Sequence, residues 1–242
     1  MRKKAQGGKR SLSGRRIFML QKLTDAMEQY RLIAILRGIP GAMLPEVLDA
    51  ICDGGIRLAE ITFDAAVQVP DAEIAAQIER AVARMEGKMH IGAGTVLTPA
   101  QLRLTCAAGG SFVVSPHTDP ELIKAAKALG LISVSGAMTP SEIVAAHLAG
   151  ADYVKLFPAS ALGPDFIRRI HNPLPHIKLL AVSGVGVEDI PAYFSAGAYG
   201  FGIGNAIANP KLCMEGDFAA IRAHAAAYAD MCGKKRADGN ER

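Results

Sequence analysis

Residues 151–164 read ADYVKLFPASALGP and hold a short apolar run, Tyr153–Phe157, that is typical of a buried β-strand but carries Lys155 at its centre. Pro158 ends the run, and Gly163-Pro164 predicts the start of a helix. A buried ammonium is costly, so a lysine is seldom placed in such a strand unless it loses its proton, and a neutral amine can attack a carbonyl carbon. The alternative is a lysine at a strand edge whose amine reaches water.

The same pattern of strand and helix repeats along the chain from residue 32 onward. Apolar runs predict eight strands, at residues 32–36, 57–62, 89–93, 111–114, 131–134, 153–157, 177–182 and 199–203. A helical pattern follows each strand, near residues 44–53, 71–85, 164–171, 187–196 and 216–230, with further helices opening at Thr98-Pro99, Asp119-Pro120 and Thr139-Pro140. Eight strict alternations without a G-x-G-x-x-G fingerprint favour a single (β/α)8 TIM barrel over an open doubly wound sheet.

Length and charge indicate one domain without a nucleic-acid surface. The 242 residues are half hydrophobic, and no composition break divides residues 21–232. Seven of the 27 Lys and Arg residues lie in residues 1–20, which hold no acid, so residues 21–242 carry 20 cations against 23 acids, a net charge of −3. This balance argues against nucleic-acid binding. We expect residues 1–20 to form a disordered basic extension, with a transit peptide as the alternative, and residues 233–242 to form a polar tail.

Cysteines and histidines give no sign of a disulfide framework or a metal site. The four cysteines lie far apart without a C-x-x-C pattern, which predicts reduced thiols and a cytoplasmic protein. Only His117 lies near the predicted C-terminal strand ends, where we interpret it as a solvated loop residue, so no metal is expected. No apolar run approaches the roughly 18 residues of a membrane span, so no membrane contact is expected.

In a barrel the C-terminal ends of the strands meet at one mouth, where catalytic residues gather. The polar residues at these ends are Arg37, Glu60, Thr62, Thr95, Ser115, Ser135, Lys155, Ser183 and Asn205. Glu60 stands out with Lys155 because both lie inside apolar runs. Such a couple in a dry site supplies a nucleophilic amine and a proton shuttle. The alternative is a buried structural ion pair, but such pairs are weak stabilisers.

Four other strand ends suit the binding of anions. Arg37 offers a fork for a carboxylate or phosphate, unless it is an ordinary surface arginine. Thr95 ends the segment GAGT, which admits a ligand close to the backbone or forms a simple tight turn. Ser183-Gly184-Val185-Gly186 and Gly202–Asn205 both lead into helices, which suits a phosphate but also describes a glycine-rich turn without a ligand.

Taken together, these segments resemble the class I 2-dehydro-3-deoxy-phosphogluconate and 4-hydroxy-2-oxoglutarate aldolases, including the 2-dehydro-3-deoxy-6-phosphogalactonate branch. The matching segments are LIAILRG at 32–38, GIRLAEITF at 55–63, IGAGTVLTPAQ at 91–101, FVVSP at 112–116, SGAMTPSE at 135–142, VKLFPAS at 154–160 and AVSGVGVEDI at 181–190. The resemblance implies a TIM barrel, a homotrimer and no cofactor. It also implies roles for individual residues: Lys155 as the Schiff-base lysine, Glu60 as general acid/base, Thr95 at the pyruvyl carboxylate, Arg37 as a substrate-binding arginine at the mouth, Pro116 and Phe157 along the pocket, and Ser183, Gly184 and Asn205 at a phosphate.

The chain departs from this family at four places. Asp64 stands where the gluconate branch has an arginine that helps to hold a carboxylate, so Arg37 is expected to take over part of that role. Ser183-Gly184 replaces Gly-Gly, Asn205 replaces a serine, and Ser135-Gly136 replaces Pro-Gly. These changes leave the phosphate end open while keeping the Lys–Glu chemistry.

The expected reaction is cleavage of a 2-oxo-4-hydroxy acid to pyruvate and an aldehyde. The substrate is 2-dehydro-3-deoxy-6-phosphogluconate or -galactonate, which gives glyceraldehyde 3-phosphate, or 4-hydroxy-2-oxoglutarate, which gives glyoxylate. Two alternatives stay open. One is a phosphosugar isomerase or synthase on a phosphate-binding barrel, with Glu60 as its base. The other is a non-catalytic protein that binds an oxo acid.

Overall fold

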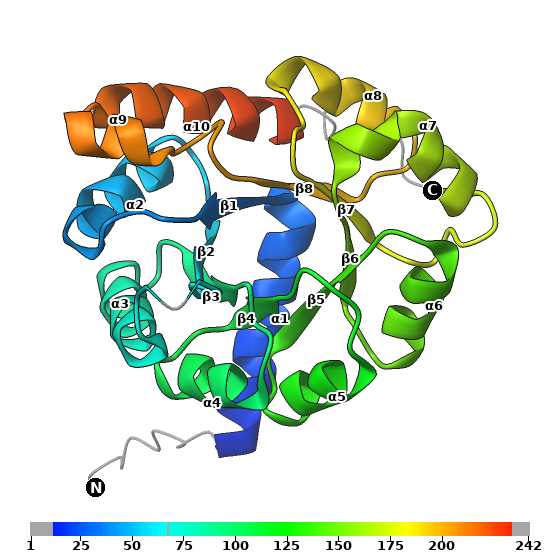
Figure 1. Ribbon diagram of the computed structural model, residues 1–242, viewed down its shortest axis with the longest axis horizontal. Helices are drawn as coiled ribbons and strands as arrows, with labels where there is room; N and C mark the ends of the chain where they lie inside the picture. The colour runs from blue at the N-terminus through cyan, green and yellow to red at the C-terminus, as the bar shows by residue number, and fades with distance from the viewer. Residues whose placement is uncertain (1–11, 67, 234–242) are drawn as a thin grey trace, which may run out of the picture.

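The computed structural model describes residues 12–66 and 68–233, and within these residues eight parallel strands close into a barrel (Figure 1). Each strand pairs with the next along the chain, and β8 returns to pair with β1. The strands are β1 (Leu32–Leu36), β2 (Leu58–Thr62), β3 (His90–Gly94), β4 (Phe112–Val114), β5 (Ile132–Ala137), β6 (Tyr153–Leu156), β7 (Leu179–Val182) and β8 (Gly200–Ile203). The predicted (β/α)8 TIM barrel is confirmed.

Helices surround the barrel and connect successive strands (Figure 1). They are α2 (Leu44–Asp53), α3 (Asp71–Arg84), α4 (Pro99–Ala107), α5 (Pro120–Ala128), α6 (Pro140–Leu148), α7 (Ala159–His171), α8 (Ile190–Ser195), α9 (Pro210–Glu215) and α10 (Phe218–Gly233), with 3-10 turns η1 (Gly41–Met43) before α2 and η2 (Val187–Asp189) before α8. The short α9 was not predicted. α7 begins before the predicted start at Gly163-Pro164, because a first turn forms ahead of Gly163, whose φ of 73° breaks the helix.

Side-chain caps explain why α4, α5 and α6 begin at the predicted residues. The Thr98 hydroxyl accepts the N–H of Gln101 at 3.2 Å, and the Gln101 side chain accepts the N–H of Thr98 at 3.2 Å, which forms a capping box. Thr139 forms the same box, and the Asp119 carboxylate accepts two N–H groups of α5. A proline at the first helical position follows each cap and costs no hydrogen bond there.

Strand side chains alternate between an outer layer against the helices and an inner layer in the lumen. The inner layer is a separate hydrophobic cluster that includes Ile33, Leu58, Phe112, Val114, Ile132, Val134, Tyr153, Leu180 and Val182. Leu23 and Met27 of α1 (Leu12–Tyr30) belong to the same cluster and pack against side chains from the beginnings of the strands. α1 therefore covers the N-terminal end of the barrel, and Figure 1 shows it crossing behind the ring of strands.

The expectation of a disordered extension over residues 1–20 is wrong for residues 12–20, which lie in α1. The basic composition of this segment hid the helix, whose later turns bury Leu23 and Met27. Residues 1–11 lie outside the described residues. So does the expected polar tail, apart from Gly233, which ends α10.

Truncating Leu23 tests whether α1 is part of the folded core. Leu23 is fully buried, so Leu23→Ala is expected to lower the free energy of unfolding by about 2–5 kcal/mol. Glu28→Ala is the control on the same helix. It removes only a half-exposed ion pair with Lys178 at 2.9 Å and should cost less than about 1 kcal/mol. Urea unfolding measures both, and equal costs would contradict the packing described.

Candidate active site

Glu60 and Lys155 point into the barrel from opposite sides. Leu58 and Tyr153 belong to the inner cluster, and the residue two positions further along a strand faces the same side. Glu60 on β2 and Lys155 on β6 therefore face the lumen one layer nearer to the C-terminal mouth. β2 and β6 are four strands apart in a closed ring of eight, so the two side chains face each other across the lumen.

Burial brings both groups toward their uncharged forms. Lys155 is 5% exposed and Glu60 is 1% exposed. Loss of water lowers the pKa of Lys155 and raises the pKa of Glu60 to about 7. The charge of each group partly offsets the effect of burial on the other, and the nearby Arg37 lowers both pKa values. The site thus holds an amine that loses its proton readily and a carboxyl group that exchanges one near neutral pH.

The Glu60 carboxyl group has an oxygen available for a ligand or a water molecule. Glu60 Oε1 is buried and has no hydrogen-bond partner among the described residues. Leaving such an oxygen unpaired is costly, so its position points to chemistry rather than stability. Gly94 makes the room, because a Cβ there would overlap Oε1 and lie 2.7 Å from Glu60 Cδ. The GAGT segment predicted a ligand close to the backbone at this glycine, and the contact of Gly94 with Glu60 was not predicted.

Arg37 and Thr95 meet at the mouth, as their places at the ends of β1 and β3 predict. Arg37 Nη2 donates to Thr95 Oγ1 at 2.9 Å. Thr95 is buried and has a φ of 54°, which a β-branched residue rarely adopts. Strained backbone of this kind gathers at functional sites. A guanidinium beside a hydroxyl can bind a carboxylate.

Phe157 lies close to the amine of Lys155, and Pro116 lies against β5, the strand next to β6. The centre of the Phe157 ring is 4.9 Å from Lys155 Nζ, and the ring is partly exposed at the end of β6. Pro116 follows β4, and its carbonyl group lies where a Cβ on Gly136 would be. Gly136 pairs with Lys155 across β5 and β6. Phe157 thus lies beside the amine, and Pro116 lies beside the residue that pairs with Lys155, positions that suit residues lining a pocket.

Ser183, Gly184 and Asn205 lie exposed at the rim, at the ends of β7 and β8. Ser183 and Gly184 have φ values of 81° and 73°. A Cβ on Gly184 would overlap Ser160 Oγ, and the Ser160 N–H donates to the Ser183 carbonyl at 3.1 Å. Ser160 was not predicted as a site residue, although it ends the matching segment VKLFPAS. The rim offers neutral polar groups, which suit a phosphate or a sugar hydroxyl.

Asp64 organises its own loop. Its carboxylate accepts the backbone N–H groups of Ala66 at 2.9 Å, Gln68 at 2.9 Å and Val69 at 3.1 Å. These hydrogen bonds lower the pKa of Asp64. Asp64 therefore shapes the connection from β2 to α3 rather than contacting a ligand, which leaves Arg37 as the cation at this side of the mouth.

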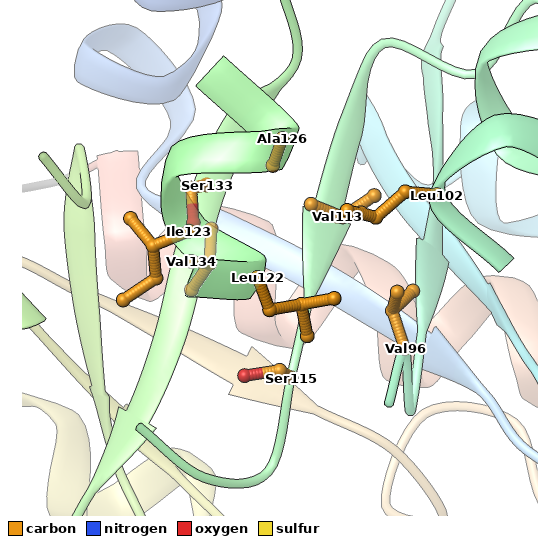
Figure 2. A pocket seen from close by; sticks show the side chains of 9 residues that line it. All are labelled: Val96, Leu102, Val113, Ser115, Leu122, Ile123, Ala126, Ser133 and Val134. Atoms are coloured by element: carbon orange, nitrogen blue, oxygen red, sulfur yellow. The ribbon is translucent and has the colours of Figure 1, made fainter. Parts of the chain in front are cut away.

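A small cavity lies outside the barrel lumen, apart from these residues. It has a volume of about 10 Å³ and lies between the outer faces of β4 and β5 and the helices α4 and α5, lined by Ser115, Ser133 and seven apolar residues. Figure 2 shows the side chains that line it. Its size is at the lower limit for one water molecule. His117 is exposed in the loop after β4. In the described part of the chain, no three His, Cys, Asp or Glu side chains cluster in a way that could hold a metal ion.

Known proteins resemble this chain over most of its length. A family model described as KDPG and KHG aldolase matches residues 23–224. A Rhizobium meliloti (strain 1021) protein named "Probable 2-dehydro-3-deoxy-6-phosphogalactonate aldolase" is 37% identical over 75% of this chain and 83% of its own. The Escherichia coli (strain K12) 2-dehydro-3-deoxy-6-phosphogalactonate aldolase is 37% identical over 72% and 82%. A solved structure described as "Native KDPGal structure" matches with a TM-score of 0.77 and 31% identity, over 85% of this chain and 96% of that one.

Proposed function

The chain belongs to the KDPG and KHG aldolase family, and from this premise we propose that it cleaves a 2-oxo-4-hydroxy acid through a Schiff base on Lys155. The protein is an aldolase and therefore a lyase. The observation that carries the proposal is the buried amine of Lys155 facing the buried carboxyl group of Glu60. Phosphorylated six-carbon acids of the gluconate or galactonate series and 4-hydroxy-2-oxoglutarate are the proposed substrates.

In the proposed reaction the neutral amine of Lys155 adds to the C2 ketone, and loss of water gives an iminium. Glu60, acting through a water molecule, moves protons during this step and then takes the proton from the C4 hydroxyl. The C3–C4 bond breaks and the aldehyde leaves. The electron pair of the broken bond moves into the iminium and forms an enamine. Protonation and hydrolysis of the enamine release pyruvate and restore the amine.

The proposed substrate lies between two polar groups at the mouth. Arg37 and Thr95 bind the carboxylate next to the reacting ketone, and Pro116 and Phe157 flank the pyruvyl carbons. Ser183, Gly184 and Asn205 hold the far end of the substrate, with Ser160 behind Gly184. The residues named at the far end are neutral, so they can donate hydrogen bonds to a phosphate but supply no cation. Phosphorylated and unphosphorylated substrates therefore both fit this end of the site.

Reductive trapping tests the Schiff base directly. Pyruvate with borohydride is expected to add one three-carbon group at Lys155, which peptide mass spectrometry locates. A panel that compares pyruvate release from phosphorylated six-carbon substrates and from 4-hydroxy-2-oxoglutarate identifies the aldehyde. Turnover of a phosphosugar without trapping would favour an isomerase or synthase. Pyruvate binding without cleavage of any aldol would indicate a non-catalytic protein.

Alanine substitutions at two glycines with the same φ distinguish the effect of backbone strain from the effect of a steric collision at the far end of the site. Gly184 and Gly87 both have a φ of 73°, but a Cβ on Gly87 meets nothing within 4 Å. Replacing either by alanine should cost about 1 kcal/mol of stability, because an L-residue is strained at positive φ. Only Gly184→Ala also displaces Ser160, so it alone should lower kcat/KM, by at least about tenfold. Equal kinetics of the two variants would count against this placement of the substrate.

We propose a cytoplasmic homotrimer. The resemblance supports the trimer, and exposed large apolar side chains such as Leu148 and Met214 are available for contacts between copies. The four cysteines are free thiols, which suits a reducing compartment. Among the described residues, no helix has the length and the apolar character that crossing a membrane requires. Sedimentation analysis measures the number of copies.

A further inference from the structure

The loop that follows β4 is tied to β5 by side-chain hydroxyl groups. Ser115 Oγ donates to the His117 carbonyl oxygen at 2.6 Å, and Ser135 Oγ donates to the same oxygen at 3.2 Å. Thr118 Oγ1 donates to the Gly136 carbonyl oxygen at 2.7 Å. We call the two serine hydroxyls together with the His117 carbonyl oxygen the hydroxyl clamp.

The hydroxyl clamp lies behind the pocket rather than in it. Val114 and Val134 belong to the inner cluster, so the serines that follow them, Ser115 and Ser135, face outward. Both serines are buried, and Ser115 lines the small cavity in Figure 2. A carbonyl oxygen has two lone pairs, so the two donors fill its hydrogen-bonding capacity. Neither serine is placed to touch a substrate, and any effect on the reaction passes through the loop.

The hydroxyl clamp fixes Pro116 against Gly136 of β5. A Cβ on Gly136 would overlap the carbonyl carbon and oxygen of Pro116 and would lie 2.7 Å from His117 N, so the Pro116–His117 peptide packs directly against Gly136. Gly136 is the residue of β5 that pairs with Lys155. A shift of the His117 carbonyl group therefore moves Pro116, which flanks the pyruvyl group in the proposed reaction.

We propose that Ser115 and Ser135 are positioning residues of the aldol reaction, because their hydroxyls jointly hold the His117 carbonyl group and so keep Pro116 seated against Gly136 as a wall of the pocket. The inference rests on the proposed function, since the wall it describes belongs to that site. Each hydroxyl can hold the carbonyl group when the other is absent, so the two residues act as a pair.

A double-mutant cycle tests this pairing. Ser115→Ala and Ser135→Ala are each expected to raise KM for the aldol substrate by less than about threefold, whereas the double variant should raise it by about tenfold or more. kcat should change by less than about threefold, because Lys155 and Glu60 are untouched. A purely structural defect would lower the fraction of active enzyme, and with it the apparent kcat, while KM stayed unchanged.

One further variant serves as the control for the double-mutant cycle, and another serves as a second test. Ser133→Ala removes a buried hydroxyl from the same outer face of β5, at the cavity in Figure 2 and away from His117, and should leave KM and kcat unchanged. Thr118→Val is the second test if the double variant folds poorly. It should raise KM because the tie to Gly136 is lost. If the wild type is an active aldolase but the KM effects of the two serine substitutions are additive or absent, the hydroxyl clamp is overturned and the proposed function stands. A wild type that forms no pyruvate adduct on Lys155 overturns the proposed function and this inference with it.

Discussion

Replacing Lys155 by methionine is expected to abolish aldol cleavage, with kcat/KM falling by at least about four orders of magnitude. Among the described residues Lys155 is the one buried lysine, so the variant lacks the amine that forms the iminium in the proposed reaction. Methionine is unbranched and one atom shorter than lysine, and the site is already dry, so the fold should survive. Loss of the ammonium also removes the charge that lowers the pKa of Glu60, so that pKa should rise further above 7. Steady-state kinetics, borohydride trapping and urea unfolding measure these effects.

Lys178 supplies the control for Lys155. It precedes β7 and pairs with Glu28 of α1, at the opposite end of the barrel. Lys178→Met should therefore keep the pyruvate adduct and the rate of cleavage. A Lys155→Met protein that still forms the adduct would show that another amine carries the reaction.

Replacing Glu60 by glutamine is expected to lower kcat by about 10²- to 10⁴-fold, the usual contribution of a general acid/base. The amide fills the same volume beside Gly94 but cannot exchange a proton. The wild-type rate should change through an apparent pKa near 7, because that is the pKa to which burial raises Glu60, and the variant should lose this transition. Loss of the carboxylate also lowers the pKa of Lys155 further, so the amine remains able to bind pyruvate.

Glu60→Gln also tests how much the burial of Glu60 lowers the free energy of unfolding. The pKa of Glu60 is raised from 4.5 to about 7 on folding, so between these pH values the folded protein binds more protons than the unfolded chain. The free energy of unfolding therefore falls as pH rises through this window. Glu60→Gln should be about as stable as the wild type near pH 4.5 and more stable by about 1–3 kcal/mol near pH 8. A variant that is less stable at pH 8 would show that Glu60 is a structural ion-pair partner.

The barrel could be predicted from sequence because its strands are continuous apolar runs and three of its helices begin with a Thr or Asp cap followed by proline. α1 could not, because the cationic composition of residues 1–20 concealed a helix whose apolar residues come later. The short first turn of α7 was hidden by the break at Gly163. These failures share a cause, since local composition does not show which surface a segment will cover.

The candidate site was predictable where a charged residue lies within an otherwise apolar strand. Lys155 and Glu60 are charged residues in apolar strands, and strand alternation places both in the lumen. Relations between residues distant in sequence were not predictable. Gly94 shapes the place of Glu60, Asp64 turns back to its own loop, and Ser160 supports Gly184, and each of these depends on a packing contact.

The helix across the N-terminal end of the barrel has a kinetic consequence. With that end covered by α1, molecules reach and leave the amine from the same side, and the aldehyde lies between the attached pyruvyl carbons and bulk solvent. In the proposed reaction the aldehyde must then depart first, the water that hydrolyses the imine follows it inward, and pyruvate is the second product to leave. In the synthetic direction the same geometry makes pyruvate the obligatory first substrate.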